Sequence, residues 1–100
     1  MFNNVSVSYD ERKDVYTVSG FFGSNFKRTI LKILGKKKAG ALFIDYSLTG
    51  FSFYSFFTLE VYRVLETLTS ANSKYSVDVK SVSNFLKYVD ENIWDESHIK

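Results

Sequence analysis

The residues best suited to chemistry lie in the stretch from Ala41 to Leu68. Asp45 follows the most apolar segment of the chain, and Ser55 stands where a helical pattern begins. Ligands and partners gather at the carboxyl ends of strands in an open α/β sheet. A hydroxyl at a helix amino end suits a phosphate, because backbone N–H groups and the helix dipole favour negative charge there. The structural alternatives are a strand-end Asp45 that accepts hydrogen bonds from loop N–H groups and a Ser55 that caps the helix.

Enzymatic and metal-binding motifs are missing from the sequence. The single histidine, His98, lies in a polar terminal segment, and there is no cysteine, so neither a Ser-His-Asp arrangement nor a thiolate site has support. The acidic residues cluster only in the segment Asp10–Asp14, DERKD, and toward the carboxyl terminus, without a ligand spacing. No glycine-rich phosphate-binding motif occurs. We therefore expect a protein that is not an enzyme and needs no cofactor or metal.

Composition indicates one small domain. The chain has 100 residues, of which 45% are hydrophobic, and this is enough to build a core without disulfides. We predict a single α/β domain over residues 1–94 and a polar tail over residues 95–100. The net charge of +2 is too small to indicate nucleic-acid binding. The amino end does not read as a signal peptide, and no apolar run is long enough for a membrane span, so we expect a cytoplasmic protein without membrane insertion.

Four segments read as strands. Apolar and polar residues alternate in Val5–Tyr9, and Val15–Ser19 follows the charged turn, so these two segments predict an antiparallel hairpin. Ala39–Ile44 is continuously apolar, which is typical of a parallel strand covered on both faces. Tyr75–Val79 predicts a short fourth strand.

Helical spacing of apolar residues predicts three helices. The first begins at Phe26 and ends before Gly35, which is placed to be its C′ residue. The second runs from Ser55 to Leu68, after a loop over Ser47–Tyr54, and the third follows the turn at Lys80–Ser81. The resulting order is β-β-α-β-α-β-α. It predicts a single four-stranded mixed sheet that contains one right-handed parallel βαβ unit, with the helices mainly on one face.

The order of elements and the central stretch resemble the STAS domain, the fold of bacterial anti-sigma factor antagonists and of the cytoplasmic tails of sulphate transporters. The family's motif is a strand that ends in Asp, a small hydrophobic loop, and Asp-Ser-Ser-Gly-Leu at the start of a helix. Leu48–Ser55, LTGFSFYS, followed by Leu59, is similar to that loop and helix entry, and Asp45 is similar to the strand-end Asp. The resemblance spans about Val5–Asn92 and is mostly a matter of pattern outside the centre.

The chain departs from the family's motif where the phosphorylated serine would stand. In a gapless alignment Ser55 falls on the motif's Asp, Phe56 falls on its phosphorylatable Ser, and Thr58 replaces its Gly. A shift by one residue puts Ser55 on the acceptor position but misplaces Leu59. The gapless register is preferred and implies that the phosphorylation switch is lost, whereas the shifted one leaves Ser55 as a phosphorylation site.

Aromatic residues are the stronger lead to function. Seven of the ten phenylalanines fall in Phe21–Phe26 and Phe51–Phe57. We expect the loops that contain them to open at one end of the sheet, with Phe51 and Phe57 in the core and Phe22 or Phe56 exposed. The alternative is that most of these rings turn inward. The residues predicted to contact a partner are Phe21, Phe22, Phe53, Ser55, Phe56 and Thr58.

The leading hypothesis is therefore a non-catalytic STAS-like protein-interaction module. The resemblance implies a kinase-type anti-sigma factor, or another signalling or transporter subunit, as the partner. A second hypothesis is a small viral or mobile-element binding protein that acts by self-association, as a homodimer, or by capture of a host protein. A third and weaker one is nucleic-acid binding through Lys27, Arg28 and Lys36–Lys38, with Phe21 and Phe22 as stacking rings. A solvated helix end is the favoured interpretation of the lysine run.

Overall fold

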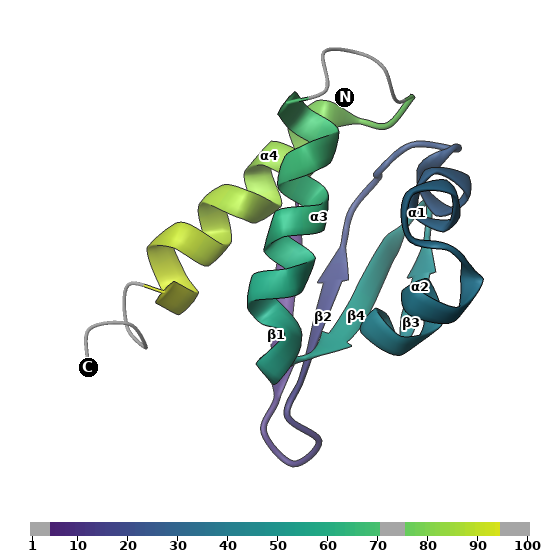
Figure 1. Ribbon diagram of the computed structural model, residues 1–100. Coiled ribbons are helices and arrows are strands. Elements are labelled where there is room, and N and C mark those ends of the chain that lie inside the picture. The colour runs from purple at the N-terminus through teal and green to yellow at the C-terminus, as the bar shows by residue number, and fades with distance from the viewer. Residues whose placement is uncertain (1–4, 71–75, 95–100) are drawn as a thin grey trace.

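The computed structural model describes residues 5–70 and 76–94 and has an antiparallel sheet with helices against it (Figure 1). The sheet has the order β1-β2-β4-β3, and every neighbouring pair is antiparallel. The elements are β1 (Ser6–Asp10), β2 (Val15–Ser19), α1 (Phe26–Leu34), α2 (Lys36–Leu42), β3 (Asp45–Ser47), β4 (Gly50–Tyr54), the 3₁₀ turn η1 (Ser55–Phe57), α3 (Thr58–Ser70), α4 (Val79–Tyr88) and its π-helical continuation η2 (Val89–Ile93).

The predicted amino-terminal hairpin is confirmed. β1 pairs with β2 so that Val7 lies opposite Val18 and Tyr9 opposite Tyr16, and these four residues share the face turned toward the helices. The turn closes through a hydrogen bond of 2.7 Å from the Asp14 N–H to the Asp10 carbonyl. The predicted alternation thus becomes one covered and one open face.

The prediction of a strand over Ala39–Ile44 is wrong. Residues 39–42 belong to α2, where Ala39 and Leu42 are buried and Gly40 and Ala41 are exposed, which is helical rather than alternating burial. A short apolar run does not by itself distinguish a buried strand from a buried helix. Gly35 does end α1 with a positive φ of 86° and an N–H bond to the Leu31 carbonyl. However, α2 begins at the next residue, so the lysine run forms its first turn.

The predicted loop over Ser47–Tyr54 contains the central strand of the sheet instead. β4 pairs with β2 on one side and with β3 on the other. Phe51 and Phe53 of β4 are buried, whereas Ser52 and Tyr54 point to the other face and are more accessible. The alternation of a strand with one covered face is therefore present within a segment that is rich in Ser and Gly.

The predicted fourth strand, Tyr75–Val79, is also wrong where it can be described. Tyr75 lies outside the described residues, Ser76–Asp78 form no strand, and Val79 begins α4. Asp78 caps this helix by accepting a hydrogen bond of 3.1 Å from the Ser81 N–H. Without these two strands there is no parallel βαβ unit in the described part of the chain, and the sheet is antiparallel rather than mixed.

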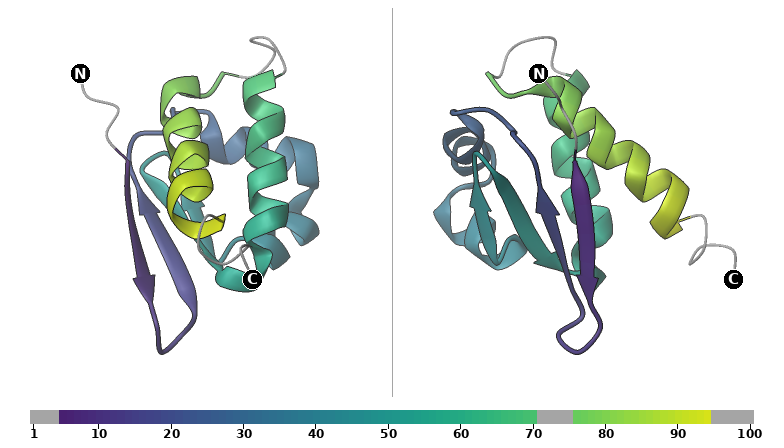
Figure 2. Two further views of the ribbon diagram at one scale, coloured as in Figure 1. Left: turned by 90° about the vertical axis from the view of Figure 1, so that its left-hand side faces the viewer. Right: turned by 180° about the vertical axis from the view of Figure 1, so that it is seen from behind.

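The helices pack on one face of the sheet, as predicted, and the view from behind shows the strands with no helix in front of them (Figure 2). α3 and α4 lie side by side, with α3 burying Val61, Leu65 and Leu68 at helical spacing. The open face carries a row of small and polar residues, among them Ser8, Thr17 and Ser52.

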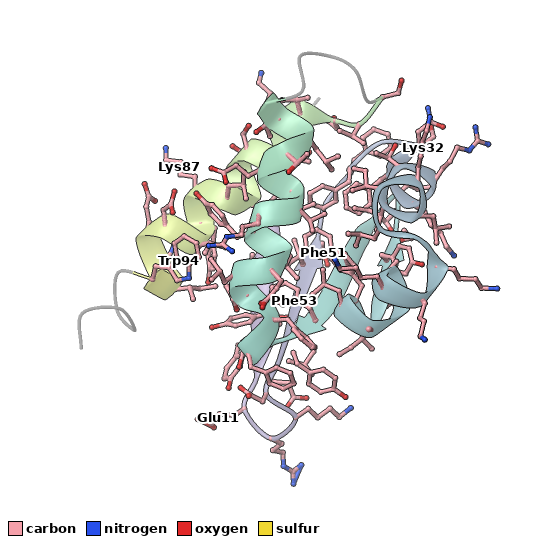
Figure 3. The ribbon with its side chains drawn as sticks, in the orientation of Figure 1. Glu11, Lys32, Phe51, Phe53, Lys87 and Trp94 are labelled. Atoms are coloured by element: carbon pink, nitrogen blue, oxygen red, sulfur yellow. The ribbon has the colours of Figure 1, made fainter. Side chains whose placement is uncertain are left out.

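Phe51 stands at the centre of the core, between the sheet and the helices (Figure 3). Its ring lies 5.2–6.0 Å, centroid to centroid, from five other rings: those of Phe22, Phe26, Phe43, Phe53 and Phe85. These rings come from the β2–α1 connection, α1, the α2–β3 connection, β4 and α4. One residue of the interior strand β4 therefore joins the sheet to α1 and α4, and its burial confirms the prediction that Phe51 is a core residue.

A substitution at Gly50 tests the central position of β4. A Cβ atom there would collide with the carbonyl oxygen of Val18, and the φ angle of 149° disfavours any side chain. We expect Gly50→Ala to lower the free energy of unfolding by about 3 kcal/mol, measured by urea titration with the fluorescence of Trp94.

Gly40→Ala is the matched control, because a Cβ at Gly40 meets no atom within 4 Å and the residue lies in α2. This change should raise the stability by about 0.5–1 kcal/mol. Equal effects at the two glycines would contradict the close β2–β4 approach.

Candidate protein-interaction surface

A cluster of three residues fastens the β1–β2 hairpin to the start of α3. The Ser55 N–H donates to the Asp14 carbonyl over 2.9 Å, and the Ser55 hydroxyl donates to Asp14 Oδ1 over 2.7 Å. The Tyr9 hydroxyl donates to the same carboxylate oxygen. Asp14 adopts a positive φ of 61°, a conformation that Asp tolerates better than most residues. We call Tyr9, Asp14 and Ser55 the Asp14 junction.

The hydrogen bonds set the protonation states in the Asp14 junction. The hydrogen bonds from Tyr9 and then Ser55 lower the pKa of Asp14 below its ordinary value of 3.8. The hydrogen bond to Asp14 raises the pKa of Tyr9 from 10.0 to about 12. At neutral pH the junction is therefore one carboxylate that accepts from two neutral hydroxyls. A carboxylate whose pKa is lowered is a poor general base, so the Ser55 hydroxyl has no activating partner here.

Ser55 is the first residue of η1, whose N-cap is Tyr54, and its hydroxyl donates to Asp14 instead of accepting a capping hydrogen bond. The expected capping role of Ser55 is therefore wrong. Thr58 is buried, and its hydroxyl donates to the Ser55 carbonyl over 2.6 Å. Thr58 therefore does not lie on the surface as predicted. A phosphate on Ser55 would place its negative oxygens against the Asp14 carboxylate, and like charges at such a distance repel.

An apolar ridge follows the Asp14 junction along the chain. The Phe56 side chain is 67% exposed, and its ring stacks on that of Tyr54 with the centroids 5.5 Å apart and the planes within 6°. Leu59, one helical turn further, is also exposed. We call Tyr54, Phe56 and Leu59 the η1 ridge. Ser55 lies between Tyr54 and Phe56 in the sequence, so its hydrogen bonds to Asp14 restrain the backbone that carries these two rings.

An apolar groove of about 340 Å³ lies next to the η1 ridge, between the α1–α2 segment and α3. Its walls are formed by the apolar residues Leu34, Ala41, Leu42, Phe57 and Val64, and its charged rim by Lys38, Glu60 and Arg63. The ring of Phe57 lies 4.6 Å from that of Phe56, so the groove and the ridge form one continuous surface. Phe57, predicted as a core residue, is partly buried and packs against the core.

The six residues predicted to contact a partner do not gather in one place. Phe22 and Phe53 are fully buried in the core. Phe21 is 50% exposed but follows the end of β2 that pairs with Gly50, whereas Phe56 follows the opposite end of β4. The length of the strand, about 14 Å, separates these ends. The expectation that the two aromatic loops open at one end is therefore wrong, because β2 and β4 are antiparallel.

Asp45 and Ser55, the two residues that the sequence offers for chemistry, are not brought together. Asp45 is exposed and begins β3 rather than ending a strand, opposite Ser52 of β4. Of the predicted residues only Ser55 and Phe56 belong to the ridge and its support. Sequence reasoning missed Tyr54, Leu59 and the groove. The alternation of buried and accessible residues in β4 is the sequence signal that could have placed Tyr54 on the surface. The groove could not be predicted, because its wall includes α2 and the sequence predicts a strand there.

Within residues 5–70 and 76–94, no three His, Cys, Asp or Glu side chains gather as a metal site would require. None of the helices described is long and apolar enough to cross a membrane. No protein-family model, curated protein or solved structure matches the chain.

The Asp14 junction predicts a pH dependence of stability. Because the pKa of Asp14 is lowered on folding, its contribution is complete above the unfolded pKa, near 3.8, and is lost as the pH falls through the lower folded value. The stability difference between wild type and Asp14→Asn should therefore shrink from pH 7 toward pH 2 in urea titrations. Glu11→Gln at the exposed hairpin tip is the control, and a pH-independent difference for Asp14→Asn would contradict the junction.

Ser55 variants test whether the site tolerates negative charge. We expect Ser55→Asp to be less stable than Ser55→Ala at pH 7, because it adds a carboxylate beside Asp14. In an Asp14→Asn background this excess destabilisation should largely vanish, as thermal unfolding of the four variants can show. If Ser55→Asp matched or exceeded Ser55→Ala in stability, a phosphate at Ser55 would be compatible with the fold.

Proposed function

We propose that this protein is a non-catalytic, cytoplasmic protein-interaction module that binds its partner through the η1 ridge and the adjoining groove. The observation that carries the proposal is the 67% exposure of Phe56 beside an apolar groove. Large aromatic side chains contribute most of the energy at protein interfaces when a partner covers them. An exposed ring that stays fixed on a hydrogen-bonded support loses little freedom on binding.

The shape and chemistry of the groove favour an amphipathic helix as the bound segment. Its walls are apolar, and its rim carries the cations Lys38 and Arg63 and the anion Glu60. Helices bind such grooves by inserting apolar side chains at helical spacing, while charges at the rim select the partner and its orientation. The Phe56 ring then packs beside the inserted helix.

The resemblance to the STAS domain supports the same end of the same helix as the binding site. It implies a kinase-type anti-sigma factor, or a signalling or transporter subunit, as the partner. The antiparallel sheet differs from the mixed sheet that this resemblance implied, so the surface, rather than membership of that family, carries the proposal. Self-association and the capture of a host protein would use the same η1 ridge. The experiments below distinguish these two modes from binding to a signalling partner.

The test uses two matched exposed phenylalanines at opposite ends of the sheet. Phe56→Asp should abolish the capture of a specific protein from the native host in a pull-down, while Phe21→Asp leaves it intact. Both variants should keep the wild-type circular dichroism spectrum, since both side chains are at least half exposed. Unchanged capture by Phe56→Asp would refute the proposed surface.

Ala41→Glu extends the test to the groove, because Ala41 is exposed and lines it. The added carboxylate should weaken capture at least tenfold by placing a charge where apolar side chains insert. Sedimentation of the purified chain at several concentrations distinguishes partner capture from self-association. A dimer that Phe56→Asp converts to a monomer would show that the ridge serves self-association.

A further inference from the structure

The small net charge conceals a separation of charge along the chain. Residues 15–44 contain six cations and no Asp or Glu: Lys27, Arg28, Lys32, Lys36, Lys37 and Lys38. The whole chain has 13 Lys and Arg and 11 Asp and Glu. The remaining residues therefore carry 7 cations against 11 anions, a charge of −4, beside a segment of +6.

The fold gathers these six cations on one side of the molecule. All six belong to α1 or α2, two helices that pack against each other, and every one of these side chains is exposed. Lys32 of α1 and Lys87 of α4 point away from opposite sides of the structure (Figure 3). We call the exposed face of α1 and α2 the basic face.

Within residues 5–70 and 76–94, anionic side chains do not neutralise the basic face. None of its six cations forms an ion pair with a residue that the structure describes. Lys27 contacts an aromatic ring, since its Nζ lies 5.4 Å from the centre of the Tyr46 ring, and this contact leaves the positive charge in place. A surface of uncompensated cations lowers the free energy of a polyanion held against it.

We propose that the basic face binds the phosphodiester backbone of nucleic acid without sequence preference. Charge complementarity is the argument: α1 is about 14 Å long, which matches about four nucleotides at a rise of 3.4 Å, and α2 adds cations beside it. Phe21, half exposed in the connection from β2 to α1, supplies a ring on which a base stacks.

An anionic membrane is the competing polyanion, and the exposed residues argue against it. Helices that lie in a membrane surface insert a wide apolar face between the lipids. The large exposed apolar side chains of the described chain are Tyr9, Phe21, Ile44, Leu48, Tyr54, Phe56, Leu59 and Val79. None of them belongs to α1 or α2, and Phe21 is the one in the connection that leads into α1. The two helices therefore present charge without the wide apolar face that membrane insertion needs.

The basic face is separate from the η1 ridge, so the two proposals fail independently. Lys38 alone belongs to both the basic face and the groove rim, and it is left unchanged in the test. The test variant is Arg28→Glu with Lys37→Glu, one exposed cation from each helix. The control is Lys80→Glu with Lys87→Glu, two exposed cations of α4, which makes the same change in net charge elsewhere.

Fluorescence anisotropy with a labelled single-stranded DNA of mixed sequence measures the binding at rising salt concentration. We expect the logarithm of affinity to fall with that of salt with a slope of about −2 to −3, as for three or four phosphate contacts. The test variant should bind at least tenfold more weakly than wild type, and the control variant less than threefold more weakly. Phe21→Ala should weaken binding, and Phe56→Asp should leave it within threefold.

Three results would overturn the proposal. One is no binding of DNA at low salt. Another is equal weakening of DNA binding by the test and control variants, which would show that net charge, rather than the basic face, determines the affinity. The third is binding to phosphatidylserine vesicles without binding to DNA, which would assign the basic face to a membrane. Double-stranded DNA and RNA of the same length, bound with similar salt slopes, would support recognition of the backbone alone.

Discussion

The structure depends on the packing around Phe51. This ring of β4 lies close to five others, which come from β4 itself, from α1 and α4, and from the connections on either side of α1 and α2. Offset and edge-to-face pairs of this kind add stability beyond the area that they bury. Because a chain of 100 residues has a small core, a single well-placed ring can set the distance between the sheet and both helical pairs. Gly50, the residue before Phe51, lies so close to the Val18 carbonyl oxygen of β2 that a Cβ atom would not fit there. This close approach positions β4, and with it the Phe51 ring, against β2.

Local patterns predicted the elements whose neighbours in sequence are also neighbours in space. The alternation of Val5–Tyr9 and the helical stripe of α3 each follow from one covered face, so the hairpin and α3 could be predicted. The run at residues 39–44 could not be assigned, because its covered residues, Ala39 and Leu42, are defined only by the core that forms around α2. β4 was missed because its serine and glycine suggested a loop, although Phe51 and Phe53 already alternated with Ser52.

The working surfaces were harder to predict than the fold, for a related reason. Phe22 and Phe56 each belong to a pair of phenylalanines that follows a strand, yet Phe22 completes the core and Phe56 lies outside it. Residue type does not decide this difference. The net charge was similarly uninformative: it averages a basic pair of helices with an acidic remainder. The direction of the strands, rather than residue type, determines which aromatic rings form the ridge. The position of α1 and α2 in the fold determines where the cations gather.

The Asp14 junction has a consequence for how the molecule opens. The tip of a two-stranded hairpin usually frays first, since few contacts hold it. Here the tip residue Asp14 is bound to Ser55, 41 residues later, through both backbone and side chain. The hairpin end cannot separate without also releasing η1, the turn that leads into α3, and local fraying becomes part of a larger cooperative opening. Slow hydrogen exchange at the Ser55 amide would be the signature of this coupling, at a point of the chain that solvent otherwise reaches easily.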